Sequence, residues 1–157
     1  MVKTKKVSTQ DQAATGRLDS SLRGIIGYTM KRATNILQAD AAQVLEEFGL
    51  RITTFSALVV ICDHPDVTQS QIAAALNMER SNTVLIIDAL EQAGLIGRHR
   101  VPTDRRSYAL RATLEGMKIR NAAVRALAER EEVILHDLTR EERAALLALL
   151  GKIASRS

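Results

Sequence analysis

Arginine side chains are concentrated in the stretch "RHRVPTDRRSYALR", which spans residues 98–111 and contains Asp104 as its only acidic residue. Guanidinium groups bind phosphate and carboxylate oxygens through paired N–H donors. The proline and the alternating run "SYALRA" are typical of a turn beside a short extended segment. The stretch therefore predicts an anion-binding surface on a β-hairpin, and a solvated charge cluster is the alternative interpretation.

The histidines and the single cysteine show no pattern typical of catalysis. His64, His99 and His136 lack the spacing to Cys62 or to a carboxylate that metal ligands require. The chain also contains no glycine-rich phosphate loop and no nucleophile elbow. We therefore expect no enzyme activity, no metal and no cofactor. Cys62 ends the apolar run "ALVVIC", which favours a buried structural thiol over a redox sensor.

The composition indicates one helical domain, or a small domain with an oligomerisation element. The 157 residues are 46% hydrophobic and only 3% aromatic, so Ala and Leu must supply most of the packing. A net charge of +4 is compatible with a nucleic-acid partner. One cysteine excludes an intrachain disulfide, no apolar run could span a bilayer, and the N-terminus has no apolar signal region. We expect a cytoplasmic protein with no membrane contact.

A first helix is predicted by apolar residues that recur at three- and four-residue steps. Asp19 or Ser20 can cap its start, and it should run to about Phe48 before Gly49 ends it. The polar residues before it, 1–18, are expected to form a flexible basic tail.

Two further helices should follow in close succession. The second is expected to begin near Thr53 or Thr54 and to end at Pro65. Thr68 followed by Gln71 matches a capping box, so the third should begin there. A short turn, "NM", then separates the third helix from the next one.

The following segment combines a helix with a hairpin. Residues 79–94 should form a fourth helix that Gly94 closes. "LIGRHRV" and "SYALRA" are expected to be short strands, with "PTDRR" as the turn between them. Two helices joined by a tight turn and followed by a hairpin predict a winged helix-turn-helix.

The C-terminal part should contain two helices. Thr113 can cap a long helix that runs to about His136. Thr139 and Glu142 match a second capping box, which predicts a final Leu-rich helix. The predicted fold class is therefore mainly α.

The stretch from "VTQSQIAAALNM" to "RATLEG" resembles the DNA-binding core of the MarR family of bacterial transcriptional regulators. "TQSQIAAAL" before an "RSN" helix start and the segment "DALEQAGLI" carry the resemblance, and "LTREERAALLALLGKI" is similar to the family's last helix. A further part is the Asp-x-Arg and Leu-x-x-Thr-x-x-Gly pattern at Asp104, Arg106, Leu110, Thr113 and Gly116.

The resemblance covers about residues 20–154 and implies a homodimer on duplex DNA with a roughly palindromic operator. The first, fifth and last helices would form a dimer layer that carries two winged domains. The domains implied are the tail at 1–18, a dimerisation helix at 19–50, a winged helix-turn-helix at 51–112 and C-terminal dimerisation helices at 113–157.

The fourth helix carries the candidate base-reading residues. Side chains at the start of such a helix reach base edges in the major groove first. Asn82 can pair with adenine and Leu85 can contact a thymine methyl, whereas capping of the helix by Ser81 and Asn82 is the alternative. The full candidate set is Arg80, Ser81, Asn82, Thr83 and Leu85.

Phosphate contacts are expected from two other elements. Ser70 and Gln71 begin the third helix, whose free amides favour phosphate, although a simple capping box is the alternative. On the wing, Arg106 should enter the minor groove and Asp104 should hold it through a charge-assisted pair. Arg105 should contact phosphate.

One departure from the family pattern motivates an alternative hypothesis. Members often carry Thr and Arg where this chain has Val84 and Leu85, in the apolar run "TVLII". This run leaves fewer polar groups for base edges. The alternative hypothesis is therefore a helical dimer that binds a small molecule or protein partner without specific DNA binding.

The resemblance also implies a small-molecule effector. Family ligands include aromatic acids and, in some branches, their CoA thioesters, and they bind between the dimer layer and the winged domain. The first hypothesis is accordingly a dimeric repressor released by a small anionic or aromatic ligand. Candidate ligand-binding residues are Arg23, Tyr28, Met30, Lys31 and Phe55, for which plain core packing is the alternative.

Overall fold

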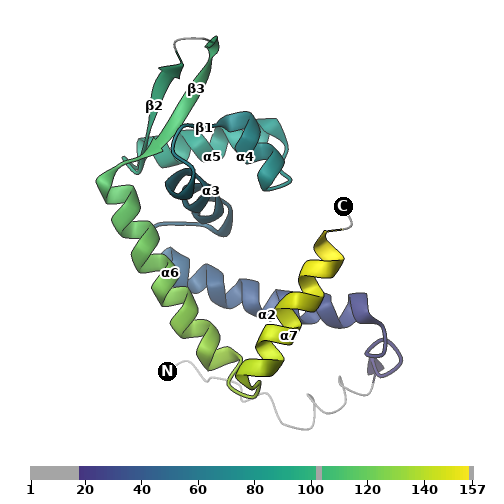
Figure 1. Ribbon diagram of the computed structural model, residues 1–157. Coiled ribbons are helices and arrows are strands. Elements are labelled where there is room, and N and C mark those ends of the chain that lie inside the picture. Colours follow the sequence, from purple (N-terminus) through teal and green to yellow (C-terminus); the bar gives the residue numbers. More distant parts are fainter. Residues whose placement is uncertain (1–17, 102–103, 156–157) are drawn as a thin grey trace, which may run out of the picture. The chain divides into compact units, whose positions relative to one another are not determined.

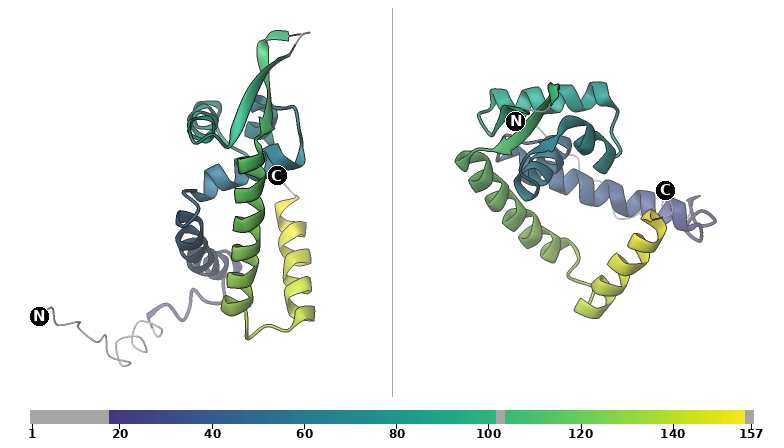
Figure 2. Two further views of the ribbon diagram at one scale, coloured as in Figure 1. Left: turned by 90° about the vertical axis from the view of Figure 1, so that its left-hand side faces the viewer. Right: turned by 45° about the horizontal axis from the view of Figure 1, so that its top comes forward.

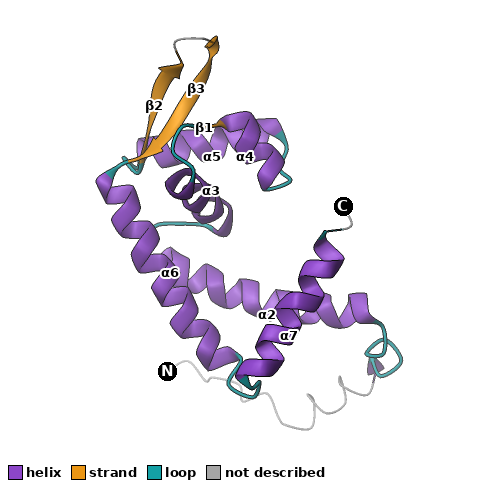
Figure 3. Cartoon of the chain, viewed as in Figure 1, coloured by secondary structure: helices purple, strands orange, loops and turns teal. Residues whose placement is uncertain are grey.

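The structure is a computed structural model that describes residues 18–101 and 104–155, with the backbone alone at 101 and 104–107. The chain divides into two units, with the boundary between Ala39 and Asp40 inside helix α2. The helices are α2 (Ile26–Glu46), α3 (Ile52–Asp63), α4 (Gln69–Ala75), α5 (Arg80–Gln92), α6 (Leu114–Ile134) and α7 (Arg140–Ala154) (Figures 1 and 3). The strands are β1 (Val67–Thr68), β2 (Ile96–Val101) and β3 (Asp104–Ala112).

The first helix begins later than the sequence predicts. Residues 19–24 form turns, in which the Leu22 N–H donates to the Asp19 carbonyl at 2.9 Å, and α2 starts only at Ile26. The prediction of a start at Asp19 or Ser20 is therefore wrong. Its physical reason is that the Asp19 carboxylate accepts hydrogen bonds from side chains on α2 instead of capping backbone amides.

The end of α2 confirms the predicted glycine stop. Gly49 has a φ of +67°, a conformation that costs glycine little. The Leu50 N–H then donates to the Leu45 carbonyl at 3.0 Å, and both leucine side chains are buried. The turn at Gly49 therefore anchors both of its ends in the core. The next helix, α3, begins within two residues of the predicted start.

The core of the second unit lies between α3, α5, α6 and the sheet. Apolar side chains from each of these elements are excluded from solvent. Helix α3 contacts α4, α5, α6 and β3, which agrees with its apolar sequence along most of its length. The largest fully buried side chains include Leu58, Ile61, Ile72, Ile87, Leu90 and Leu110.

Side-chain caps start three of the helices, as the sequence predicts. Thr68 Oγ1 accepts from the Gln71 N–H at 3.3 Å, and Gln71 Oε1 accepts from the Thr68 N–H at 2.9 Å. Thr113 accepts from the Gly116 N–H at 3.0 Å at the start of α6. The Thr139–Glu142 capping box of α7 is also present.

The sheet has the order β1-β3-β2 and is antiparallel throughout. β1 was not expected, because a two-residue strand has no detectable alternation. The hairpin is confirmed, but the turn "PTDRR" is wrong in extent, because β3 begins at Asp104 opposite Val101. The next pair is Arg100 with Tyr108, so three residues of β3 form an irregularity that the alternating pattern does not encode. Pro102 and Thr103 lie outside the described residues.

Helix α6 starts at the base of the hairpin, which both views in Figure 2 show. The Thr113 N–H donates to the Leu95 carbonyl at 2.9 Å. Gly116 packs so closely that an added Cβ would lie 2.0 Å from the same carbonyl oxygen. Glycine at this position therefore permits the close approach of α6 to Leu95, the residue that precedes β2.

Candidate nucleic-acid interface

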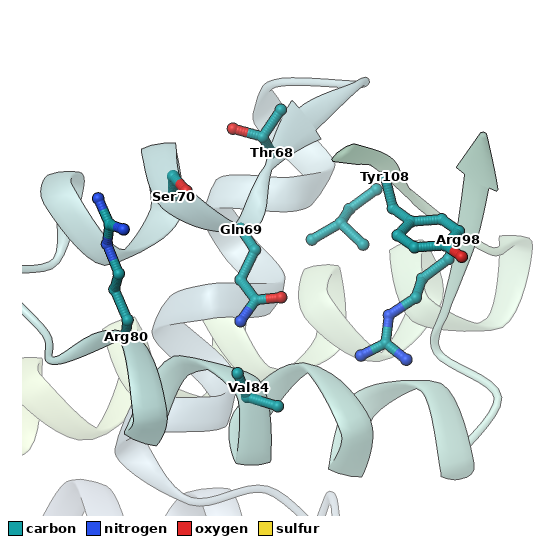
Figure 4. A pocket seen from close by; sticks show the side chains of 8 residues that line it. Thr68, Gln69, Ser70, Arg80, Val84, Arg98 and Tyr108 are labelled. Atoms are coloured by element: carbon teal, nitrogen blue, oxygen red, sulfur yellow. The ribbon is translucent and has the colours of Figure 1, made fainter. Parts of the chain in front are cut away.

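A groove of about 330 Å³ runs between the start of α4, the outer face of α5 and the hairpin. Figure 4 shows Arg80 at one end of the groove and Arg98 with Tyr108 at the other, with Gln69 and Val84 between them. The groove is lined by Thr68, Gln69, Ser70, Arg80, Val84, Arg98, Tyr108 and Leu110. The start of α4, α5 and the hairpin thus share one surface and could contact a single partner together.

The exposed face of α5 contains most of the predicted base-reading residues. Arg80, Ser81 and Asn82 are exposed in the first turn, and Leu85 is 68% exposed one turn further. These side chains are exposed because Ile86, Ile87 and Leu90 turn the opposite face of α5 into the core. This end can therefore present donors and a methyl-binding surface to a ligand.

Thr83 is a correction to the predicted set. Its side chain is completely buried, and its hydroxyl donates to the Glu79 carbonyl at 3.0 Å. It therefore satisfies the helix backbone and packs in the core, so it cannot contact a base. Its position between the exposed Asn82 and Val84 made the error hard to avoid from sequence alone.

At the start of α4, the structure separates Ser70 from Gln71. Ser70 is exposed and lines the groove. Gln71 Oε1 accepts from Thr68 as part of the capping box, and the residue lines a different hollow beside His64, so its contact with phosphate stays a prediction. Gln69, which sequence reasoning missed, lies in the groove instead.

The arginines at the hairpin base are already paired. Arg98 donates to the carboxylates of Asp88 and Glu91 on α5, with an N–O distance of 2.6 Å to Glu91. Arg111 binds Asp66 through two hydrogen bonds. Acidic residues outside the stretch, on α5 and in the loop before β1, therefore neutralise two of its arginines.

Tyr108 is a second residue that the sequence reasoning missed. It is 46% exposed and lines the groove opposite α5. The phenol combines an apolar ring with a hydroxyl, which suits a surface that contacts sugar and phosphate groups. Alternation along β3 could have found it, because it shares a strand face with Leu110, which also lines the groove.

At the wing tip, the backbone of Asp104, Arg105 and Arg106 belongs to β3. The side chains of these three residues lie outside the described part of the structure. The minor-groove role of Arg106, its pairing with Asp104 and the phosphate contact of Arg105 therefore remain predictions.

The predicted effector residues lie in different places along the chain. Arg23 and Tyr28 both donate to the Asp19 carboxylate, at 2.9 and 2.8 Å. Met30 is half-buried and Lys31 is exposed on α2. Phe55 packs against the core of the second unit. The structure thus brings only Arg23 and Tyr28 together by direct contact with a shared partner.

Other chemistry has no visible support among the described residues. No group of three or more His, Cys, Asp or Glu side chains in that part of the chain could hold a metal ion. Cys62 is half-buried against the core. No helix of the described segments is long and apolar enough to cross a membrane.

The chain is similar to known proteins of one family. Residues 50–108 match the MarR family. The HTH-type transcriptional regulator PecS of Dickeya dadantii is 31% identical over 132 residues, which cover 82% of this chain and 79% of PecS. The structure of the transcriptional repressor CouR bound to a 23-mer DNA duplex is 35% identical, with a TM-score of 0.82 over 87% of this chain and 96% of CouR.

A second CouR structure, bound to p-coumaroyl-CoA, is 33% identical with a TM-score of 0.76 over 85% of this chain and 94% of that one. The family match at residues 50–108 covers α3, α4, α5 and most of the hairpin. The chain therefore belongs to the MarR family of winged-helix transcriptional regulators.

Proposed function

We propose that this chain is a homodimeric, sequence-specific repressor that a small anionic or aromatic ligand releases from DNA. The observation that carries the proposal is the groove, in which the exposed first turn of α5 lies beside the start of α4 and the hairpin. An α5 seated in the major groove would direct Asn82 and Ser81 to base edges. The start of α4 and the wing arginines would bind the backbone.

The apolar residues of α5 fit this proposal. Leu85 is 68% and Val84 39% exposed, so both could contact thymine methyl groups without losing hydrogen bonds. Part of the sequence preference would then come from methyl contacts and DNA shape. The alternative hypothesis, a dimer without specific DNA binding, is one outcome of the test below.

Dimerisation is supported by apolar surface on the C-terminal helices. Val133 of α6 and Leu147 and Leu149 of α7 are 59%, 72% and 58% exposed, and several large apolar side chains exposed on two consecutive helices are typical of a protein–protein interface. A second copy that covers them would place two recognition helices on one duplex. We expect a roughly palindromic operator as the result.

Release by a ligand is supported by similarity to CouR, a repressor whose structure bound to p-coumaroyl-CoA resembles this chain. The proposed effector class is accordingly an aromatic acid or its CoA thioester. Such a ligand would act by favouring a spacing of the two recognition helices that no longer matches the operator.

The test is a titration of the protein against the DNA upstream of its own gene and against a scrambled duplex, at two salt concentrations. Selective binding that weakens with salt is expected. Arg106→Ala should weaken it by more than about 1 kcal/mol, while Arg125→Ala, which removes an exposed arginine of α6, should not. Equal binding to both duplexes would support the alternative hypothesis instead.

The dimer and the ligand are tested separately. Leu147→Glu should yield monomers in light scattering, whereas Leu114→Glu, at a leucine that is 75% exposed, should leave the mass unchanged. p-Coumaroyl-CoA or free p-coumarate added to the DNA complex should release the protein, with free CoA as the control. Release by none of these compounds would remove this ligand class from the proposal.

A further inference from the structure

Asp19 is surrounded by hydrogen-bond donors although it lies in a short turn ahead of α2. Its Oδ1 accepts from Arg23 Nε at 2.9 Å, and its Oδ2 accepts from the Tyr28 hydroxyl and from Arg32 Nη1, both at 2.8 Å. The Asp19 side chain is only 13% exposed, whereas Arg23 and Arg32 are 49% and 48% exposed. Three donors thus enclose one carboxylate at the surface.

Two of the three donors also contact each other. Tyr28 and Arg32 are four residues apart on α2, so they share one face of the helix. The Arg32 guanidinium carbon lies 5.9 Å from the centroid of the Tyr28 ring, within the range of a cation–π contact. The phenol and the guanidinium are therefore preorganised to bind a planar anion.

Beyond the hydrogen bonds of its carboxylate and its carbonyl, little holds Asp19 in place. Leu18 and Leu22, the large apolar residues nearest to it in the chain, are 88% and 44% exposed, so little apolar burial holds this turn. Hydrogen bonds from Arg23 and Tyr28 lower the pKa of the Asp19 carboxyl, which means that the donors favour an ionised oxyanion. An external oxyanion could replace the carboxylate at the cost of few other contacts.

We propose that Arg23, Tyr28 and Arg32 form a binding site for a carboxylate or phosphate group of a small ligand, and that the chain's own Asp19 occupies this site as an internal competitor. The tethered carboxylate has a high effective concentration, so it sets the anion concentration needed to displace it. Displacement frees the turn ahead of α2 from the helix. The proposal deepens the effector response and rests on the proposed function for its regulatory meaning, but anion binding itself can be measured without DNA.

Tyrosine fluorescence provides the readout. The chain has two tyrosines and no tryptophan, so Tyr108→Phe leaves Tyr28 as the only strong fluorophore. A carboxylate that accepts from a phenol quenches its emission. In this background, Asp19→Ala should raise the Tyr28 emission, and saturating acetate or inorganic phosphate should quench it again. Sodium chloride at equal ionic strength should have no such effect.

The expected result is that Asp19→Ala gains a saturable quenching by acetate or phosphate, whereas the Tyr108→Phe parent, in which Asp19 already quenches Tyr28, shows little change over the same concentrations. Asp19→Asn, which keeps the side-chain volume, should act in the same direction. Adding Arg32→Gln to Asp19→Ala should abolish the saturable quenching. The anion with the lower half-saturating concentration identifies carboxylate or phosphate as the preferred group.

Asp40→Ala is the matched control. Asp40 also lies on α2, is 14% exposed and binds Arg130 at 2.7 Å, so it removes a comparable charge from the same helix. It should leave the anion titration unchanged. Quenching in Asp19→Ala that chloride reproduces, that Arg32→Gln leaves intact or that Asp40→Ala also produces would overturn the site. Failure of DNA release with intact anion binding would instead reject the proposed effector response.

Discussion

Arg111 in β3 donates hydrogen bonds from Nε and Nη2 to the two carboxylate oxygens of Asp66, at 2.7 and 2.9 Å. Asp66 lies between α3 and β1 with a φ of +70°, and its backbone N–H donates to the Leu110 carbonyl at 3.0 Å. The hydrogen bonds from Arg111 lower the pKa of Asp66. The ion pair therefore stabilises the fold fully above the ordinary carboxyl pKa, and this stabilisation is lost as the pH falls from there through the lowered pKa of Asp66.

Asp66→Asn tests whether this pair orients the hairpin. Asparagine tolerates the positive φ, so the variant removes the charge and keeps the backbone. We expect several-fold weaker DNA binding, because the base of the wing loses its bidentate contact with the loop before α4. Glu115→Gln, which removes an exposed acid that lies 3.9 Å from Lys118 on α6, is the control for charge alone. Equal affinity for both variants would contradict an orienting role.

Arg98→Gln should weaken DNA binding although Arg98 need not contact DNA. The change leaves Asp88 and Glu91 without their shared partner, and two uncompensated carboxylates beside the groove repel phosphates. The loss should shrink at high salt. Adding Asp88→Asn and Glu91→Gln should restore most of the affinity. A direct phosphate contact of Arg98 predicts instead that the triple variant stays weak.

Thr83→Val and Asn82→Ala separate burial from recognition on α5. Thr83→Val keeps the buried volume and loses only a hydrogen bond to a carbonyl of its own helix, so the free energy of unfolding should change by less than about 1.5 kcal/mol. Its DNA affinity should equal that of the parent. Asn82→Ala should lose about 1–3 kcal/mol of DNA-binding free energy without a change in stability. Chemical denaturation and operator titration measure the two effects.

Gly116→Ala should destabilise the fold by about 1–3 kcal/mol or more, because its Cβ would lie 2.0 Å from the Leu95 carbonyl oxygen. α6 would have to move away from the hairpin base. Gly97→Ala is the matched control, since its Cβ would meet only His99 Nε2, at 3.6 Å. Thermal unfolding of both variants checks the prediction, and similar melting temperatures would rule out the close packing of α6.

The sequence predicted most element starts because the signals are local. Thr68 with Gln71, Thr113, and Thr139 with Glu142 cap helices through partners within three residues, and Gly49 and Gly94 adopt the positive φ that ends a helix. The start of α2 could not be predicted in this way. Asp19 has the residue type of a cap, but its carboxylate binds Arg32, 13 residues further along.

The candidate site was likewise predicted only in part from the sequence. Their position at the start of α5 marked Asn82, Thr83 and Leu85 as candidates, and Asn82 and Leu85 are indeed exposed. The same argument included Thr83, which is buried. A residue at the border of a helix face is buried or exposed according to the neighbouring elements, and those are known only from the packed structure.

The sequence by itself determined the order of the helices, the hairpin and the concentration of arginine, because periodicity, capping and composition act over a few residues. Only the tertiary structure decided which of those arginines are available. Arg111 binds Asp66, 45 residues away, and Arg98 binds acids on α5. Ion pairs of this kind form only between side chains that the fold brings within about 4 Å, because Coulomb attraction depends on distance in space. The order of residues in the sequence does not give that distance.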